Sequence, residues 1–213
     1  MGRLQLVTDA TTEPLTVAEA KLFLRIDDTA EDAGLIPEFI HAARRRVEAY
    51  TRRSLVTTTW RYTVDARELD RLVQRVSRRR GGSPLPRLSL SGVEIILPRP
   101  PCISITSVKY YGDDDVAVTY NLDNYLLDVS SDSKPRLLFA YGASLPSVRE
   151  LASFEVNYTS GYGATASSVP DDLVQAVKRV LSALYEHRGD TIGVDTDTIL
   201  DDIIPTYRVR RAF

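Results

Sequence analysis

Residues 170–187 read P-D-D-L-V-Q-A-V-K-R-V-L-S-A-L-Y-E-H and have the periodicity of a helix with one apolar face. The apolar positions are Leu173, Val174, Val177, Val180, Leu181, Leu184 and Tyr185. Asp171 and Asp172 fall in the first turn and His187 in the last, as the helix dipole favours, and Gly189 is placed to end the helix. Because an amphipathic helix is stable only when its apolar face is covered, this helix needs partners elsewhere in the chain.

The N-terminal region supplies these partners in the form of two predicted helices. Thr16 and Glu19 have the spacing of a capping box, which predicts a helix beginning there. A second helix is predicted from about residue 31 to residue 53. Its apolar face consists of Leu35, Ile36, Phe39, Ile40, Ala43, Val47 and Tyr50. Segments 14–54 and 170–188 together predict a small helical bundle that forms the base of the protein.

Between these helical segments, residues 55–160 change to the pattern of β-strands. Segments rich in β-branched and aromatic residues predict strands at 56–64, 93–97, 103–111, 116–120, 124–128, 136–140 and 153–159. The run from Gly112 to Asp115 predicts a hairpin turn between two of them. The expected fold class is therefore α+β, a helical bundle with an inserted antiparallel β module and an extended C-terminal tail.

One helical segment with an arginine-rich face interrupts the β module within residues 66–92. Leu69, Leu72, Val73 and Val76 are spaced as one apolar helix face. The candidate DNA-facing residues are Arg67, Arg71, Arg75, Arg78, Arg79 and Arg80. Like charges at i and i+4 cost an isolated helix a few tenths of a kcal/mol per pair, a cost that a partner phosphate or carboxylate would remove. The alternative is a basic face that only contacts water.

The C-terminal residues 189–213 are interpreted as a linker followed by a tail. In the tail, apolar and basic residues alternate from Tyr207 onward, which suits a strand added to the sheet of another chain. The candidate contact residues are Tyr207, Arg208, Val209, Arg210, Arg211 and Phe213. The alternative is a disordered terminus.

The composition and the missing motifs exclude several classes of protein. A formal net charge of −2 argues against nucleic-acid binding through bulk charge. The single cysteine, Cys102, rules out an internal disulfide, and no apolar run is long enough to cross a bilayer. His41 and His187 have no partner motif, so we expect no catalytic residues, no metal and no cofactor. A carboxylate–metal enzyme site at the aspartate clusters 113–115 or 195–202 is the weakest alternative.

Several stretches in one order resemble the head–tail connector (adaptor, or head-completion) proteins of long-tailed bacteriophages and gene transfer agents. They are P-L-T-V-A-E-A-K-L-F-L-R-I-D, V-E-A-Y-T-R-R-S-L-V-T-T-T-W-R-Y, L-P-R-P-P-C-I-S-I-T-S-V-K-Y-Y, N-Y-L-L-D, V-N-Y-T-S-G-Y-G, V-P-D-D-L-V-Q-A-V-K-R-V-L-S-A-L-Y-E-H-R and I-I-P-T-Y-R-V. The resemblance extends from Pro14 to Val209. The arginine-rich segment 66–92 departs from it, because it is longer than the usual link between strands.

This resemblance implies a structural virion protein without catalysis, assembled in the cytoplasm of a bacterial host. Such proteins form a dodecameric ring under the portal, around the channel through which double-stranded DNA passes, and join the capsid to the tail. The implied partners are the portal protein, further copies of the chain, and a stopper or tail-completion protein, with no membrane. The C-terminal tail is expected to reach the portal. Leu173, Val177, Val180 and Leu184 are expected in the core of the last helix or in the ring interface.

The distribution of charge is compatible with a ring. Acidic residues gather at 27–32 and 195–202, and basic residues at 44–46, 52–53 and 75–80, so neighbouring copies in a head-to-tail ring can pair unlike patches. Two other functions stay open at this point. One is a DNA-binding assembly factor that uses the arginines of 71–80, and the other is a different neck or tail-completion protein.

Overall fold

A computed structural model describes residues 2–26, 34–79, 90–144, 147–188 and 195–209. The chain divides into two compact units. The β unit consists of residues 1–9 and 58–160, and the helical unit of residues 10–57 and 161–213. The chain therefore passes between the units three times. The fold class is α+β, as predicted, with five α-helices and antiparallel sheets among the described residues.

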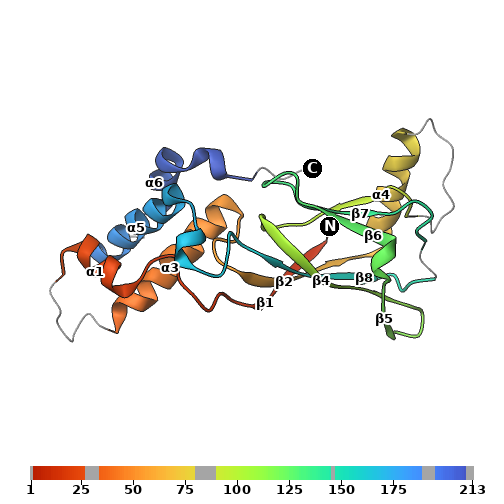
Figure 1. Ribbon diagram of the computed structural model, residues 1–213, viewed down its shortest axis with the longest axis horizontal. Helices are drawn as coiled ribbons and strands as arrows, with labels where there is room; N and C mark the ends of the chain where they lie inside the picture. The colour runs from red at the N-terminus through yellow and green to blue at the C-terminus, as the bar shows by residue number, and fades with distance from the viewer. Residues whose placement is uncertain (1, 27–33, 80–89, 145–146, 189–194, 210–213) are drawn as a thin grey trace. The chain divides into compact units, whose positions relative to one another are not determined.

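The helical unit contains α1 (Val17–Leu24), α3 (Leu35–Thr51), α5 (Asp171–Glu186) and α6 (Thr196–Ile203), shown in Figure 1. The predicted capping box is present, because the Thr16 hydroxyl accepts from the Glu19 amide and the Glu19 carboxylate accepts from the Thr16 amide. The two long helices α3 and α5 pack against each other around one apolar core. The three helices that the sequence predicts for this region are thus all present.

Helix α6 corrects the interpretation of residues 189–213 as only a linker and an extended tail. Residues 196–198 are the first turn of α6, which Asp195 caps by accepting from the amides of Asp197 and Thr198. The Thr198 hydroxyl also donates to Asp195, and this bond, followed by the one from the Thr198 amide, lowers the pKa of Asp195. Leu200 is fully buried in the core of the helical unit. The sequence 189–194 and Gly189 lie outside the described residues.

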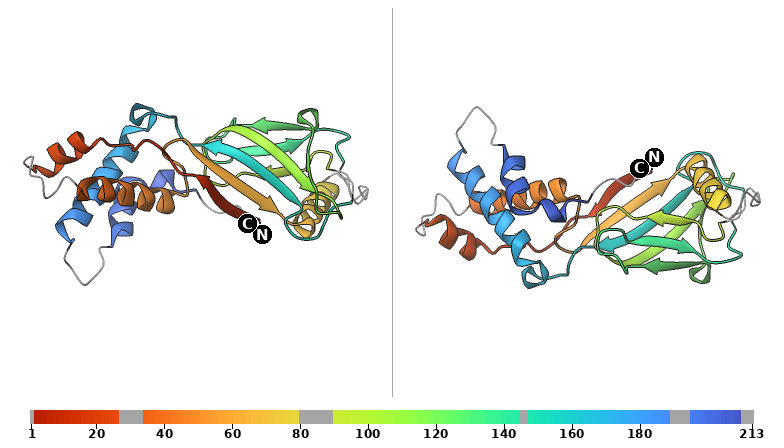
Figure 2. Two further views of the ribbon diagram at one scale, coloured as in Figure 1. Left: turned by 90° about the horizontal axis from the view of Figure 1, so that it is seen from below. Right: turned by 90° about the horizontal axis from the view of Figure 1, so that it is seen from above.

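The β unit contains two antiparallel sheets, one stacked over the other (Figures 1 and 2). The first sheet has the order β1-β2-β8-β4-β5 and the second the order β3-β7-β6. The strands are β1 (Arg3–Thr8), β2 (Thr58–Val64), β3 (Glu94–Ile96), β4 (Cys102–Tyr111), β5 (Ala117–Thr119), β6 (Tyr125–Asp128), β7 (Arg136–Phe139) and β8 (Phe154–Ser160). All seven predicted strands are present. Strand β1 was not predicted as a strand, and it pairs with β2 over most of its length.

The space between the two sheets is filled by aromatic and aliphatic side chains. Tyr120, Phe139 and Phe154 lie edge to face with ring centroids 5.5 to 6.0 Å apart. Helix α4 (Ala66–Arg79) adds Leu69 and Val73 to the same core. The helix predicted within 66–92 is therefore present, and it is anchored by its apolar face.

Candidate functional site

Helix α4 presents an exposed row of arginines on the side opposite its buried face. Arg67, Arg71, Arg75 and Arg78 are all exposed, whereas Leu69 and Val73 are buried. Arg79 lies in the last turn, with a side chain outside the described part, and Arg80 lies outside it altogether. We call Arg67, Arg71, Arg75 and Arg78 the arginine face.

The arginine face has few charge partners of its own. Arg67 approaches Glu150 at 3.4 Å, and both side chains are more than three quarters exposed, so this ion pair contributes little. The side chains of Arg71, Arg75 and Arg78 make no ion pair or hydrogen bond with the residues that the structure describes. The face therefore offers three guanidinium groups that an anionic partner can bind.

The C-terminal tail is bound to the end of α3 as far as it is described. Residues Pro205–Tyr207 form the 3-10 helix η3, so extended backbone begins only at Arg208. The Arg53 Nε donates to the Tyr207 carbonyl at 2.8 Å, and the Val209 amide donates to the Thr51 carbonyl at 3.0 Å. The predicted contact residues Arg210, Arg211 and Phe213 lie outside the described residues.

The four candidates on α5 lie in the core of the helical unit. Leu173, Val177 and Val180 have no exposed surface, and Leu184 is partly buried against the same cluster. Because three of these side chains are completely covered within one chain, their role is to hold the helical unit together.

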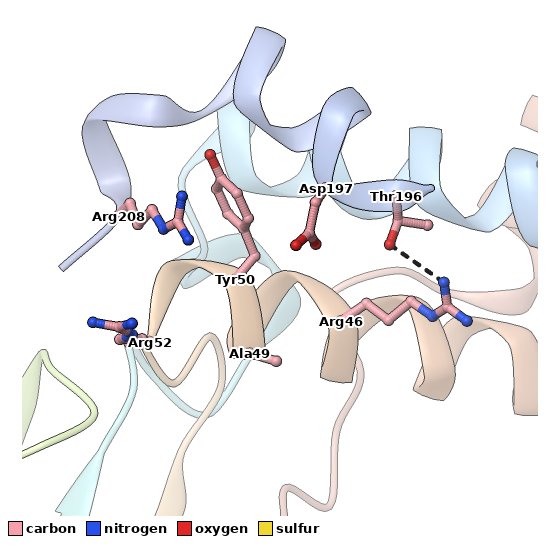
Figure 3. Close-up of a pocket in the computed structure, with 7 residues that line it drawn as sticks. All are labelled: Arg46, Ala49, Tyr50, Arg52, Thr196, Asp197 and Arg208. Carbon is pink, nitrogen blue, oxygen red and sulfur yellow. Dashed lines mark hydrogen bonds between the residues drawn. The ribbon is translucent and has the colours of Figure 1, made fainter. Parts of the chain in front are cut away.

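A pocket of about 300 Å³ lies where α3 meets α6 and the tail, shown in Figure 3. We call it the arginine pocket. Its lining residues are Arg46, Ala49, Tyr50, Arg52, Thr196, Asp197 and Arg208. The Tyr50 hydroxyl donates to Asp201. The pKa of Tyr50 is raised, mainly by burial of the hydroxyl and to a smaller extent by this hydrogen bond to Asp201. The pocket therefore brings together three guanidinium groups from two distant parts of the sequence.

Two of the predicted basic positions do not belong to any surface patch. Arg44 has no exposed surface and lies between Glu13 and Glu48, at 2.8 and 3.2 Å. Arg53 is also buried and binds the tail. The burial of these two arginines could not be predicted from the sequence, because nothing in a run of basic residues distinguishes a buried arginine from an exposed one.

Groups that could support catalysis are poorly placed for it. Burial raises the pKa of the Cys102 thiol to about 11, so the thiolate that would act as a nucleophile is disfavoured. In the described parts of the chain no group of three or more His, Cys, Asp or Glu side chains could hold a metal ion. Asp114 instead accepts from the Val116 amide, and Asp115 pairs with Arg149. None of the described helices has the length and apolar character needed to cross a bilayer.

Comparison with protein families finds a match in the N-terminal part of the chain. Residues 14–78 match the model of the family described as phage gp6-like head-tail connector protein. This range contains α1, α3, β2 and most of α4, and it confirms the resemblance that the sequence motifs indicated. No curated protein matches the chain.

Three solved structures share the fold across almost the whole chain. They are described as the neck of an empty gene transfer agent (GTA) particle computed with C6 symmetry, the virion of a native GTA particle, and the neck of a native GTA particle computed with C12 symmetry. Their TM-scores are 0.73, 0.70 and 0.70, and the sequence identities are 23%, 22% and 23%. In each case 99% of this chain and 97% of the other chain are covered.

Proposed function

We propose that this chain is a structural head–tail connector in the neck of a phage-like virion. In this role it forms a dodecameric ring under the portal, around the DNA channel, and joins the capsid to the tail. The observation that carries the proposal is the likeness of 99% of the chain to a chain of a GTA neck, at a TM-score of 0.73. The family match over residues 14–78 and the buried, unreactive Cys102 support a structural role without catalysis.

Native mass spectrometry of the chain, alone and mixed with the portal ring of the same particle, tests this function. We expect a discrete complex with one copy of the chain per portal subunit, because two rings of equal copy number can repeat the same contact at every subunit. A chain that stays monomeric and never binds the portal would contradict the proposal.

The proposed contact of the tail with the portal leads to a separate prediction. Removing residues 210–213 leaves the bonds of Tyr207 to Arg53 and of Val209 to Thr51 in place, whereas removing residues 205–213 deletes them. We expect both deletions to weaken portal binding about tenfold or more, which corresponds to 1.4 kcal/mol. Only the longer deletion should also lower the melting temperature. Portal affinity equal to that of the full chain after the longer deletion would rule out a portal-binding tail.

The exposed arginine face favours a second candidate function, binding of duplex DNA by an assembly factor. We expect weak binding that falls steeply with salt, and loss of most of it in the triple variant Arg71→Glu, Arg75→Glu, Arg78→Glu. Fluorescence anisotropy with a labelled duplex at 50 and 200 mM salt measures this. The matched control is Arg179→Glu, which changes an exposed arginine on α5. Equal binding by the triple variant and the control would exclude the arginine face as a DNA contact.

A further inference from the structure

The arginine pocket carries its positive charge at two separate ends. Figure 3 shows Arg52 and Arg208 toward one end and Arg46 toward the other, and Asp197 appears between the two ends. Contacts agree with this view. The Arg52 guanidinium donates to the carbonyl of the residue after Arg208, whereas that of Arg46 donates to the hydroxyl of the residue before Asp197. Arg46 and Arg52 are six positions apart, which corresponds to about 9 Å along the axis of α3.

Most of the binding capacity of these arginines is not used inside the chain. The hydrogen bonds of Arg46 and Arg52 are long, 3.3 and 3.4 Å, and neither residue pairs with a carboxylate of the described residues. Arg208 lies 4.8 Å from the centre of the Tyr50 ring and 3.7 Å from Asp201. Each guanidinium has five N–H donors, so all three have donors left for a ligand.

The residue types of the pocket suit a ligand with carboxylate groups. Guanidinium groups bind carboxylates in a planar, two-pronged geometry. Three guanidinium groups line the pocket, and Asp197 is the only carboxylate of the lining. Because the two basic ends are about 9 Å apart, a single carboxylate cannot bind at both of them. A ligand that uses the whole pocket therefore needs at least two carboxylates, one on each side of Asp197.

The shape and surroundings of the pocket favour an acidic peptide over nucleic acid. Its volume of about 300 Å³ is that of a site for a small group, such as a projecting side chain. Asp197, Asp201 and Asp202 are exposed on α6, which lines one side. A DNA duplex carries one negative charge for about every 1.7 Å of its axis, so its continuous charge would meet these carboxylates. A peptide can place separate carboxylates at the arginines and leave the aspartates in water.

We propose that the arginine pocket binds a short acidic segment of a partner protein, with one carboxylate at Arg46 and a second at Arg52 and Arg208. An extended peptide rises about 3.3 Å per residue, so two acidic residues three positions apart are separated by about 10 Å and match the two basic ends. The pocket lies entirely within the helical unit. The inference therefore goes beyond the connector function and does not depend on ring formation.

A titration of the isotope-labelled full chain, followed by NMR at low salt, tests the site. The probes are three short Gly- and Ser-rich peptides: one with two Glu residues three positions apart, one with a single Glu, and one with Gln in place of both. We expect the two-Glu peptide to bind about tenfold tighter than the Gln peptide, and the single-Glu peptide to lie between them. The amides of residues 46–52 and 196–197 should shift. Equal affinity for all three peptides would overturn the proposal.

Variants of the basic ends connect this binding to the pocket. The double variant Arg46→Gln, Arg52→Gln should bind the two-Glu peptide no better than the Gln peptide. The matched control Arg179→Gln removes an exposed arginine of α5, outside the lining, and should bind as the unaltered chain does. If the double variant is not folded by circular dichroism, Arg46→Gln alone serves, because Arg46 is exposed. This single variant should bind the two-Glu peptide only as tightly as the unaltered chain binds the single-Glu peptide. Unchanged affinity in a folded pocket variant would refute the site.

The variant Asp197→Asn tests whether the two carboxylates lie on either side of Asp197. Removing this negative charge should raise the affinity for the two-Glu peptide about two- to fivefold and leave that for the Gln peptide unchanged. A merely structural role of Asp197 in the first turn of α6 would give no such gain. Unchanged or weaker binding of the two-Glu peptide would contradict the proposed arrangement.

Two further probes distinguish the peptide from other anions. Inorganic phosphate and a short DNA duplex are titrated in the same way, and we expect both to shift the pocket amides less than the two-Glu peptide does at equal concentration. Equal or larger shifts with phosphate would indicate a general anion site, and binding of the duplex without binding of the peptide a nucleic-acid site. Either result would overturn the proposal. A chain that binds the two-Glu peptide but never joins the portal would keep this site and lose the connector function.

Discussion

Replacing Arg44 by alanine should lower the free energy of unfolding of the helical unit by about 3–5 kcal/mol, the usual cost of breaking a buried ion pair on one side. Arg44 is completely buried, and its guanidinium donates to Glu13 and Glu48. The other oxygen of Glu48 accepts from the Leu55 amide at 3.0 Å. The variant leaves the buried Glu48 without its main cation, and it loosens the segments before α1 and after α3 together. Urea unfolding followed by circular dichroism measures the loss.

Two further variants show whether the loss comes from the buried charge. Arg45 is 40% exposed and approaches Glu48 at 3.7 Å, so Arg45→Ala should cost only about 0–1 kcal/mol. The double variant Arg44→Met, Glu48→Gln removes both charges and keeps an acceptor for the Leu55 amide. It should therefore be more stable than Arg44→Met alone. If Arg44→Ala costs no more than Arg45→Ala, the network contributes little to stability.

The elements of this fold could be predicted from the sequence because their signals are local. The capping box of Thr16 and Glu19 marks the start of one helix, and the apolar residues of 170–187 repeat at helical spacing. Both helices are present where they were predicted. The same spacing placed Leu69 and Val73 on the buried face of α4. Strand β1 escaped prediction because its neighbours set its structure. The segment is short and partly exposed, and its pairing with β2 places Leu4 and Leu6 against the core of the β unit.

The candidate site depends on contacts between distant residues, which no local pattern encodes. The arginine pocket joins Arg46 on α3 to Arg208, 162 positions later, through the packing of α6 and η3. Likewise, Arg44 and Arg46 fall in the same basic run, yet the first is buried in an ion-pair network and the second is exposed. A difference of two positions on a helix rotates a side chain by more than half a turn, which is enough to separate core from surface. The arginine face of α4 could be predicted because a single helix carries all of it.

The motif V-N-Y-T-S-G-Y-G, which contributed to the resemblance, also has a structural reason. It ends strand β8 and leads into the helical unit at Ser160 and Gly161, one of the three passages between the units. Immediately beyond, the Tyr162 amide donates to the Leu55 carbonyl, and the Thr57 amide donates to the Gly163 carbonyl. Two chain segments thus run against each other where one leaves the helical unit and the other enters it. Val56 lies between the two bonded residues of the first segment, and Gly161 comes directly before those of the second.

Replacing Gly161 by alanine should therefore lower the free energy of unfolding by about 2–6 kcal/mol, from strain and overpacking of roughly 1–3 kcal/mol each. Gly161 has a φ of +131°, which side chains rarely adopt. A Cβ there would lie 2.5 Å from the carbonyl carbon and oxygen of Val56 and 2.7 Å from the Thr57 nitrogen. All three atoms belong to the backbone, so no side chain can move aside to relieve the contact. Urea unfolding of the full chain measures the effect.

Two other glycines separate the causes of this loss. Gly142 has a φ of +84° with open space around the Cβ position, so Gly142→Ala should show the strain alone, about 1–3 kcal/mol. Gly34 has an ordinary φ of −84° and equally open space, so Gly34→Ala should be neutral or stabilising by up to about 1 kcal/mol. The expected order of stability is Gly34→Ala, then Gly142→Ala, then Gly161→Ala. If Gly161→Ala is as stable as Gly142→Ala, the backbone of Val56 and Thr57 can move away from the added Cβ. The close approach of residue 161 to this backbone would then not be a fixed feature of the fold.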